Sequence, residues 1–189
     1  MDKREVAGCV LLGAAVLAAG AYMLVTIFAP ALQTEHTLGA VQKAVSAPRI
    51  KGDRLYIPKI GLNIAYAAGG PTVLNDRAWW RYPQRGNPQR GGNFILAGHR
   101  FQIGFSPGET LRKSPFYQIN KLNPGDKIYI DFNGHRYEYL VKQRAIVKPD
   151  DVRIEAPSAR PHLTLYSCTL EGARYGREVI IGTLIAKVV

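Results

Sequence analysis

A long uncharged segment near the amino terminus limits how this chain can fold. Residues 6–32 contain no Asp, Glu, Lys or Arg and consist mainly of Val, Leu, Ala, Gly, Ile, Met and Phe. About 20 apolar residues are enough to cross a bilayer as a helix. A cleavable signal peptide is the alternative, because Ala29-Pro30-Ala31 offers small residues, but the apolar core of a signal peptide is only about 7–15 residues long. We therefore expect a transmembrane helix.

The charges that flank this segment predict its orientation. Lys3 and Arg4 precede it, and Lys43 is the nearest cation after it. Lys and Arg are enriched on the cytoplasmic side of membrane spans, which favours a cytoplasmic amino terminus. We expect residues 1–32 to form a cytoplasmic tip and anchor, residues 33–51 a stalk, and residues 52–189 one folded domain outside the cell membrane.

The chain is strongly basic, with a formal net charge of +11. A basic surface suits nucleic acid, anionic lipid or anionic wall polymer. For a domain held outside a membrane, nucleic acid is the least expected of these partners, so we predict no nucleic acid binding. Arg81, Arg85, Arg90 and Arg100 lie in one loop-rich stretch. They are candidates to face an anionic polymer, but the simpler interpretation is that most of them solvate the surface.

Short alternating strands dominate the expected domain. Residues 127–132 alternate in polarity, Asn133-Gly134 is a strong two-residue turn, and residues 136–141 return. Further strands are expected at 54–57, 62–66, 93–97, 162–168 and 178–187, with a helical turn near 72–80. Many short strands with little helix indicate a closed or nearly closed β-barrel.

Cys168 is the residue most suggestive of chemistry. The other cysteine, Cys9, lies inside the apolar amino-terminal segment, so if that segment spans a membrane, the two sulfurs cannot meet in one molecule. Cysteines outside the cell are usually paired, so a single thiol at the end of a strand-like run suggests a nucleophile. The alternative is a buried cysteine that packs as a small hydrophobe.

A thiol needs a base or a cation beside it to act as a nucleophile at neutral pH. His36 lies in the stalk, and His135 follows a hairpin turn. His162 shares a strand with Cys168, but six residues at about 3.3 Å each separate them by roughly 20 Å. His99, which follows the apolar run 94–97 and Gly98, remains as the candidate partner.

Acyl transfer also needs a donor for the negative charge that develops on the carbonyl oxygen. Arg174 and Arg177 both follow Cys168 closely. We prefer Arg177, because it opens the expected strand 178–187 and its backbone is fixed by sheet pairing. Arg174 lies among Gly172, Ala173 and Gly176 and is expected to face solvent or the rim of a substrate site.

In this order, behind an apolar segment, these residues resemble the sortase family, the membrane-anchored cysteine transpeptidases of bacterial cell surfaces. The resemblance covers the chain from about Leu55 to its end and rests on Leu55-Tyr56-Ile57-Pro58-Lys59-Ile60, Gly92-Asn93-Phe94-Ile95-Leu96-Ala97-Gly98-His99-Arg100, Pro115-Phe116-Tyr117, Leu122-Asn123-Pro124-Gly125-Asp126 and Thr164-Leu165-Tyr166-Ser167-Cys168. The last motif is similar to the family's Thr-Leu-x-Thr-Cys, with Ser167 in place of the second threonine. Arg177 stands where the family has its arginine.

The resemblance implies a mainly β fold, an eight-stranded sortase-type barrel with short helices behind one transmembrane helix. It implies a sorting-signal substrate, usually Leu-Pro-x-Thr-Gly or a relative. Cys168 would form a thioester, His99 would transfer protons, and Arg177 would hold the oxyanion or the substrate backbone. The acceptor would be an amine of a peptidoglycan precursor or a pilin lysine, and the anchor would contact membrane lipid.

The resemblance also implies a substrate groove around Cys168. Thr164 and Tyr166 share the Cys168 face of their strand and should line the groove, Ala97 should wall it from the neighbouring strand, and Ser167 should contribute beside the nucleophile. Residues 147–161 would form the loop that selects the apolar start of the signal, and residues 101–114 would form an added loop beside the site. No cofactor or metal is expected, because the acids Glu109, Asp150, Asp151 and Glu155 are scattered and do not support calcium dependence.

Two other functions remain open at this point. A hydrolytic cysteine peptidase would use the same residues and release its acyl group to water. A membrane-tethered barrel that only binds wall polymer or a partner protein would not need a reactive Cys168. The sequence also leaves open the exact signal, the acceptor amine, and whether the product is an anchored surface protein or a pilus.

Overall fold

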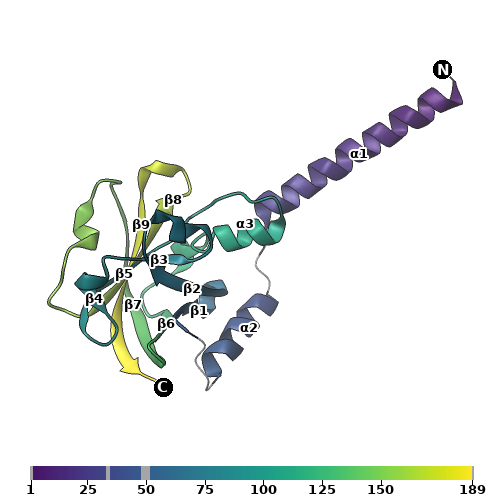
Figure 1. Cartoon of the computed structure of the whole chain (residues 1–189). Coiled ribbons are helices and arrows are strands. Elements are labelled where there is room, and N and C mark those ends of the chain that lie inside the picture. Colours follow the sequence, from purple (N-terminus) through teal and green to yellow (C-terminus); the bar gives the residue numbers. More distant parts are fainter. Residues whose placement is uncertain (1, 33–34, 48–51, 189) are drawn as a thin grey trace.

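The computed structural model describes residues 2–32, 35–47 and 52–188. Helix α1 (Lys3–Phe28) projects away from a β-barrel, and α2 (Glu35–Ser46) lies against the barrel near the base of α1 (Figure 1). Helix α3 (Pro107–Lys113) lies in the connection between strands β5 (Gly91–Ala97) and β6 (Lys127–Phe132). The expected boundaries of the stalk fall beside residues 33–34 and 48–51, which lie outside the described part of the chain.

Eight strands close into a barrel, as expected. They follow the order β3-β2-β1-β6-β7-β9-β8-β5, and β5 pairs back with β3. The two-residue β4 extends the β3 side by pairing with the start of β5. The strands are β1 (Arg54–Ile57), β2 (Leu62–Ala68), β3 (Ala78–Arg81), β4 (Gly86–Asn87), β5 (Gly91–Ala97), β6 (Lys127–Phe132), β7 (His135–Val147), β8 (His162–Thr169) and β9 (Gly172–Lys187).

The β6–β7 hairpin forms as its sequence predicts. Phe132 pairs with His135 across the turn, and Asn133 and Gly134 have φ angles of 49° and 76°. Two successive positive φ angles give the type I′ turn, whose twist matches that of the flanking strands. This turn fixes the register of the whole hairpin.

Side chains alternate between two apolar clusters in the part of the barrel formed by β5, β8 and β9. Phe94, Leu96, Leu163, Leu165 and Ile180 belong to the main core inside the barrel. The residues between them, Ile95, Ala97, Tyr166 and Val179, form a second cluster on the outer face. Because successive side chains of a strand point to opposite faces, this alternation divides each of these strands between a core face and an outer face.

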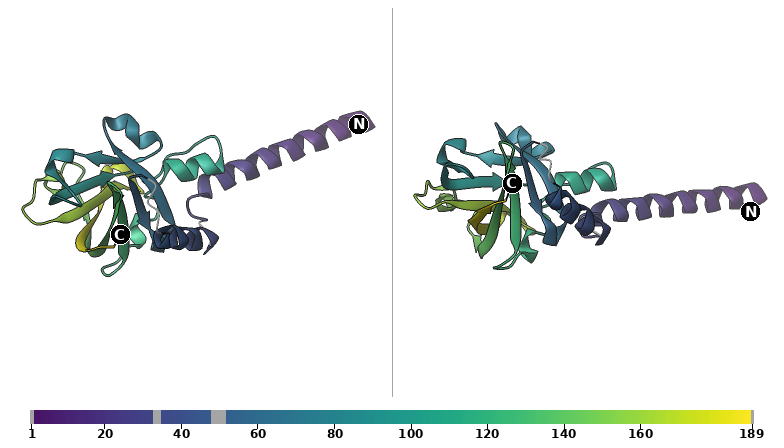
Figure 2. Two further views of the ribbon diagram at one scale, coloured as in Figure 1. Left: turned by 60° about the horizontal axis from the view of Figure 1, so that its bottom comes forward. Right: turned by 90° about the horizontal axis from the view of Figure 1, so that it is seen from below.

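The β7–β8 connection covers that outer face. It contains a short 3-10 helix, η5 (Val152–Glu155). Ile154 of this helix packs against the outer cluster. Figures 1 and 2 show the connection on the side of the barrel away from α1.

The expected stalk differs from a plain linker, because it contains helix α2, whose Val41 is buried with Tyr56 and Tyr129 of the barrel. The stretch 72–80 holds its expected helical turn as a 3-10 helix at Pro71–Asn75, which is followed by strand β3. Trp79 and Trp80 of β3 alternate, with Trp80 on the main core and Trp79 on the outer cluster.

A buried ion pair holds the end of α2 against the barrel. Asp131 and Arg136 face each other across the β6–β7 hairpin, and Arg136 Nε lies 2.6 Å from Asp131 Oδ1. Arg136 Nη1 also donates to the carbonyl oxygens of Ala44, Val45 and Ala47 at the end of α2. Because the last carbonyls of a helix lack partners within it, this cation stabilises the helix end.

Candidate active site

The pairing of β8 with β9 places Cys168 directly opposite Arg177. Side chains of opposed residues on antiparallel strands project from the same face of the sheet. Cys168 lies two residues after Tyr166, so both share the outer face of the barrel. The Cys168 side chain is half-buried and forms no disulfide.

His99 leaves the sheet beside Cys168. Strand β5 runs parallel to β8 with Ala97 opposite Tyr166, and the next amide, Gly98 N, donates to Tyr166 O over 3.1 Å. His99 is the following residue, so its backbone lies at the level of Cys168. Its carbonyl accepts a hydrogen bond from Phe116 N at 3.2 Å, and this bond fixes the point at which the chain leaves β5.

Gly98 permits this arrangement because a side chain there would collide with Phe116. A Cβ atom on Gly98 would lie 2.8 Å from the Phe116 ring. His99 is half-buried, and burial lowers the pKa of its imidazole from the ordinary value of 6.5. The neutral ring is therefore favoured at neutral pH.

The other histidines with described side chains lie away from Cys168. His135 follows the β6–β7 turn. His162 is six residues before Cys168, opposite Thr183 of β9, and its Nδ1 lies 3.0 Å from Arg160 O. The side chain of His36 lies outside the described part of the chain. Among the histidines with described side chains, His99 is thus the one whose backbone lies at the level of Cys168.

Arg177 and Arg174 differ in how the backbone holds them. Strand β9 begins earlier than expected, but Thr169 pairs with Gly172 and Cys168 with Arg177, so residues 173–176 form a bulge. Arg177 is also the first β9 residue paired with β7, opposite Val147. Arg177 is thus fixed on both sides, whereas Arg174 is exposed within the bulge.

The Arg177 side chain also holds the hairpin beside Cys168. Its Nη1 donates to Ala173 O at 2.7 Å and to Gly176 O at 3.1 Å. These bonds tie the guanidinium to the bulge and limit its range of conformations. They use Nη1, and within the described residues Nε and Nη2 make no hydrogen bond.

The residues expected to line the groove share this face but are covered in this structure. Thr164 is fully buried, and its hydroxyl donates to Asn93 Oδ1 at 2.7 Å. Asn93 Nδ2 in turn donates to Ile154 O and Ala156 O in the β7–β8 connection. Ala97 and Tyr166 are likewise buried in the outer cluster. The connection therefore lies directly over the expected groove floor.

Ser167 differs from its expected place in the groove. It lies between Tyr166 and Cys168 on β8, so its side chain projects from the opposite, inner face. It is 2% exposed, and its hydroxyl donates to Cys168 O at 3.0 Å. The structure does not support direct substrate contact by this side chain. Its hydrogen bond indicates instead that it holds the backbone at Cys168.

Sequence analysis missed a polar network beneath the β7–β8 connection. Glu155 is almost fully buried and accepts a hydrogen bond from the Tyr166 hydroxyl. Arg81 Nε lies 3.0 Å from Glu155 Oε1, and Arg81 Nη1 donates to the Tyr166 hydroxyl at 3.0 Å. Arg85 Nη1 donates to Glu155 O. Because β3 and the connection are distant in sequence, no local pattern indicated this contact.

The network corrects the expectation that the nearby arginines mainly solvate the surface. Arg81 pairs with the Glu155 carboxylate, Arg85 donates to the Glu155 backbone carbonyl, and Arg100 is only 4% exposed. Arg100 Nη1 lies 3.8 Å from Glu178 Oε2, and Glu178 also accepts a hydrogen bond from Arg144 at 2.7 Å. Arg90, the fourth arginine of the loop-rich stretch, is exposed, as a solvated residue would be.

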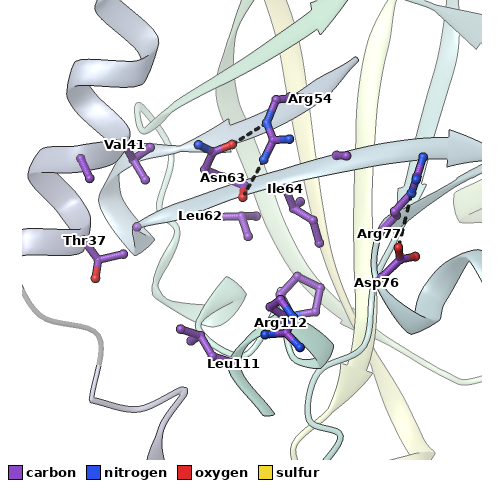
Figure 3. Close-up of a pocket in the computed structure, with 14 residues that line it drawn as sticks. Thr37, Val41, Arg54, Leu62, Asn63, Ile64, Asp76, Arg77, Leu111 and Arg112 are labelled. Atoms are coloured by element: carbon purple, nitrogen blue, oxygen red, sulfur yellow. Dashed lines mark hydrogen bonds and ion pairs between the residues drawn. The ribbon is translucent and has the colours of Figure 1, made fainter. Parts of the chain in front are cut away.

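A cavity lies away from this site. About 590 Å³ in volume, it is bounded by α2, β1, β2 and α3 (Figure 3). Arg54, Arg77 and Arg112 line it. Arg54 is bonded to Asn63, and Arg77 lies 3.6 Å from Asp76. The cavity holds no thiol or imidazole, so it is not the site around Cys168. Within residues 2–32, 35–47 and 52–188, no three His, Cys, Asp or Glu side chains are grouped to hold a metal ion.

Comparison with known proteins assigns the family. A model described as a sortase domain matches residues 55–185. The chain belongs to the sortase family. The match spans the barrel from β1 to near the end of β9 and includes His99, Cys168 and Arg177, which the register brings to one end of β5, β8 and β9.

Sortases from several bacteria are similar to this chain in sequence. Sortase SrtE1 of Streptomyces coelicolor is 27% identical over 147 residues, which is 69% of this chain and 39% of that protein. Sortase A of Bacillus anthracis is 31% identical over 94 residues, which is 50% of this chain and 41% of that protein. The matched part of this sortase thus spans about 40% of the length of these relatives.

Solved sortases share its fold. Sortase E1 of Streptomyces coelicolor, determined with a tripeptide in its active site, aligns with a TM-score of 0.60 at 24% identity, over 72% of this chain and 88% of that one. Sortase A of Listeria monocytogenes aligns with the same TM-score at 23% identity, over 72% and 90%. These likenesses confirm the sortase barrel.

Proposed function

We propose that this sortase is a cysteine transpeptidase that cleaves a carboxy-terminal, Leu-Pro-x-Thr-Gly-like sorting signal of surface proteins. The observation that carries the proposal is the register of three strands, which brings Arg177 opposite Cys168 and His99 to the same level at the end of β5. Cys168, His99 and Arg177 thus come from neighbouring strand ends, and this supports the roles of nucleophile, proton carrier and cation that covalent catalysis requires.

The reaction has two acyl transfers. The Cys168 thiolate attacks the carbonyl carbon before the scissile bond, and the bond to the departing amine breaks, which leaves a thioester on Cys168. An incoming amine then attacks the thioester carbonyl and releases the thiolate. Each step passes through a negatively charged oxygen, and the guanidinium of Arg177 stabilises that charge.

His99 carries the protons in both directions. It donates one to the departing amine and later accepts one from the incoming amine, which is general acid–base catalysis by a single imidazole. Burial lowers the pKa of His99, so the protonated form that donates is the minority species at neutral pH. The thiolate and the protonated imidazole must be present together for the first step.

The residues around Cys168 also support a peptide substrate. Thr164, Tyr166 and Ala97 share the outer face with the nucleophile, and a relative of known structure holds a tripeptide in its active site. The β7–β8 connection over this face is then the element that selects the apolar start of the signal. A structural relative from Streptococcus pneumoniae is described in terms of pilin substrate specificity. An amine of a peptidoglycan precursor or a pilin lysine is the acceptor that we propose.

Helix α1 supplies the membrane anchor in this proposal. Its segment Arg4–Phe28 is long and apolar enough to cross a membrane. Only 6% of the apolar stretch of this helix is buried against the rest of the chain. A helix that exposes apolar side chains all round is suited to lipid. We propose a single span with a cytoplasmic amino terminus and the barrel outside.

The test is to incubate the full chain in detergent micelles with a signal peptide, with and without candidate amines. The proposal predicts that an added amine converts the product from the free acid to the amide, as detected by mass. A free acid at every amine concentration would identify a hydrolase instead. An uncleaved peptide, with Cys168→Ala equal to the parent, would favour a tethered binding barrel.

A further inference from the structure

The loop that follows His99 reaches the membrane-anchor helix. In Figures 1 and 2 the segment between β5 and α3 extends beyond the barrel and runs beside the end of α1. The Tyr22 hydroxyl of α1 donates to Phe105 O at 3.0 Å. Near the base of the loop, Gln118 Nε2 donates to Pro30 O at 2.9 Å. We call residues 101–106 the post-histidine loop.

This loop exposes a row of large apolar side chains. Phe101, Ile103 and Phe105 are 42%, 52% and 91% exposed. Tyr22, to which the loop is bonded, is itself 54% exposed. Exposed apolar side chains grouped on one segment mark an interaction surface. Their partner is indicated by the helix beside them, which is the part of this chain suited to lipid.

The backbone at the tip of the loop is hydrogen-bonded within the protein. Gly104 N donates to Thr110 Oγ1 at 2.9 Å, and Phe105 N donates to Glu109 Oε2 at 2.8 Å. Phe105 O accepts from Tyr22. Backbone groups at membrane depth must be satisfied by the protein, and these bonds meet that requirement at Gly104 and Phe105. The Glu109 charge is balanced by Lys113, 2.7 Å away.

The position of Tyr22 along α1 gives the depth of the contact. Val6 begins the uncharged segment, and Tyr22 lies 16 residues later. At a rise of about 1.5 Å per residue, this distance is about 24 Å. The hydrocarbon core of a bilayer is about 30 Å thick. With Val6 at one boundary of the hydrocarbon core, Tyr22 lies about 6 Å inside the boundary nearest the barrel. It is therefore close to the interface at which Tyr side chains are enriched.

We propose that the post-histidine loop inserts into the membrane leaflet nearest the barrel, with Phe105 and Ile103 as the apolar side chains in contact with lipid. This inference rests on the proposed anchoring by α1 and goes beyond it. The domain then meets the bilayer at two places, the span and this loop.

Insertion fixes the orientation of the active site. The loop begins one residue after Arg100, and its base is closed by Gln102 N, which donates to Ser114 Oγ at 3.0 Å. The Ser114 hydroxyl donates back to Gln102 O at 3.3 Å. This short, closed path connects the inserted tip to His99, so the face that bears Cys168 is held at a set height above the lipid. Such an orientation favours a sorting signal presented on a membrane-held carrier.

The test measures lipid contact directly in the full chain. Phe105→Trp is reconstituted into vesicles whose acyl chains carry bromine, which quenches tryptophan on contact. Leu24→Trp in α1 reports the span. Val152→Trp, on the exposed η5 helix on the far side of the barrel, is the matched control for a residue in water. The emission of Trp79 and Trp80 is subtracted with the parent chain in the same vesicles.

The proposal predicts quenching at Phe105→Trp comparable to that at Leu24→Trp, and none at Val152→Trp. Quenching at Leu24→Trp alone would overturn loop insertion and leave the anchor intact. Absence of quenching at both would overturn the anchor and the insertion together. Unquenched Phe105→Trp emission that changes with protein concentration would identify a second copy of the chain as the partner instead of lipid.

A second measurement tests the effect on orientation. Phe105→Ser is assayed with the same signal as a soluble peptide and on a membrane-spanning carrier in the same vesicles. The expected result is a several-fold lower rate on the carrier and an unchanged rate on the peptide. If Phe105→Ser lost the same activity on both substrates, the loop would act through His99 alone. If Phe105→Ser matched the parent chain on both substrates, insertion would have no role in orientation.

Discussion

Cys168 and Arg177 occupy opposed positions on β8 and β9, so backbone pairing sets their separation. Arg174 lies three residues earlier in an exposed bulge. Replacing each arginine by Ala should separate their roles. Loss of one good oxyanion donor lowers kcat by roughly 10²–10³-fold, and we expect this loss for Arg177→Ala but only a small change for Arg174→Ala. Steady-state peptide cleavage measures both, and equal losses would contradict the assignment.

The burial of His99 gives a pH dependence with a definite sign. Its pKa in the folded chain is below the ordinary 6.5, so the unfolded chain binds more protons as the pH falls below about 6.5. Stability that is present above this pH is therefore lost below it. We expect the parent chain to lose more thermal stability than His99→Asn between pH 7 and pH 5. An NMR titration of His99 with a midpoint above 6.5 would contradict this account.

Elimination selected His99 from the sequence as the candidate partner of Cys168, because strand geometry is strict. His162 and Cys168 share one strand, so their separation follows from the rise per residue. The parity of β8 likewise places Thr164 and Tyr166 on the Cys168 face. The same alternation along β8 puts Ser167 on the opposite face. Ser167 was nevertheless expected in the groove, because the motif 164–168 was treated as one site. The roles of these residues in binding stay predictions.

At the scale of elements, the β7–β8 connection depends on one buried carboxylate. Glu155 pairs with Arg81 and Tyr166 and fixes the connection over the outer face. Glu155→Ala should leave the connection disordered when no peptide is bound, which raises KM. If ordering the connection on the peptide costs about 1.4 kcal/mol, KM should rise tenfold. The alkylation rate of Cys168 should stay unchanged, because the connection does not activate the thiol.

A matched control lies on the same connection. Arg153 pairs with Asp151 over 2.7 Å, but its side chain is 88% exposed. Exposed ion pairs contribute little to stability, so Arg153→Ala should leave KM within the error of measurement. If Glu155→Ala and Arg153→Ala had the same KM, the buried network would not be what holds the connection.

The seating of α2 depends on the buried pair of Asp131 and Arg136. Both side chains are almost fully buried, so Asp131→Ala leaves an unpaired charge and should lower the free energy of unfolding by about 3–5 kcal/mol. Asp131→Leu combined with Arg136→Met should cost less, because no charge is then buried. Thermal unfolding in detergent measures both variants. A double variant less stable than Asp131→Ala would contradict this explanation.

Strands were easier to anticipate than the helices beside them. Alternation and the Asn133-Gly134 turn predicted β6 and the start of β7 closely. Residues 35–46 were expected only as part of a stalk, because α2 buries little beyond Val41. The contacts that Arg136 makes to the end of this helix are distant in sequence. The Arg81–Glu155 contact was missed for the same reason. Such contacts follow from closure of the barrel, which sequence periodicity does not describe.

For the whole molecule, the fold class followed from the number of short strands and the turn signals between them. The strand and turn pattern did not predict the strand order β3-β2-β1-β6-β7-β9-β8-β5 or the pairing that closes it. Closure matters because the pairings of β5 with β8 and of β8 with β9 are what bring residues 99, 168 and 177 together. The placement of the barrel beside α1, with the post-histidine loop between them, likewise depends on tertiary contacts.

The most direct test of the account is the mass of the protein during turnover. The full chain is mixed with a sorting-signal peptide without an acceptor amine, quenched in acid and digested. We predict that the acyl part of the peptide is attached to Cys168 as a thioester, that hydroxylamine releases it, and that Cys168→Ala shows no adduct. Cleaved peptide that accumulates at the same rate in Cys168→Ala, with no adduct on the parent chain, would contradict the account.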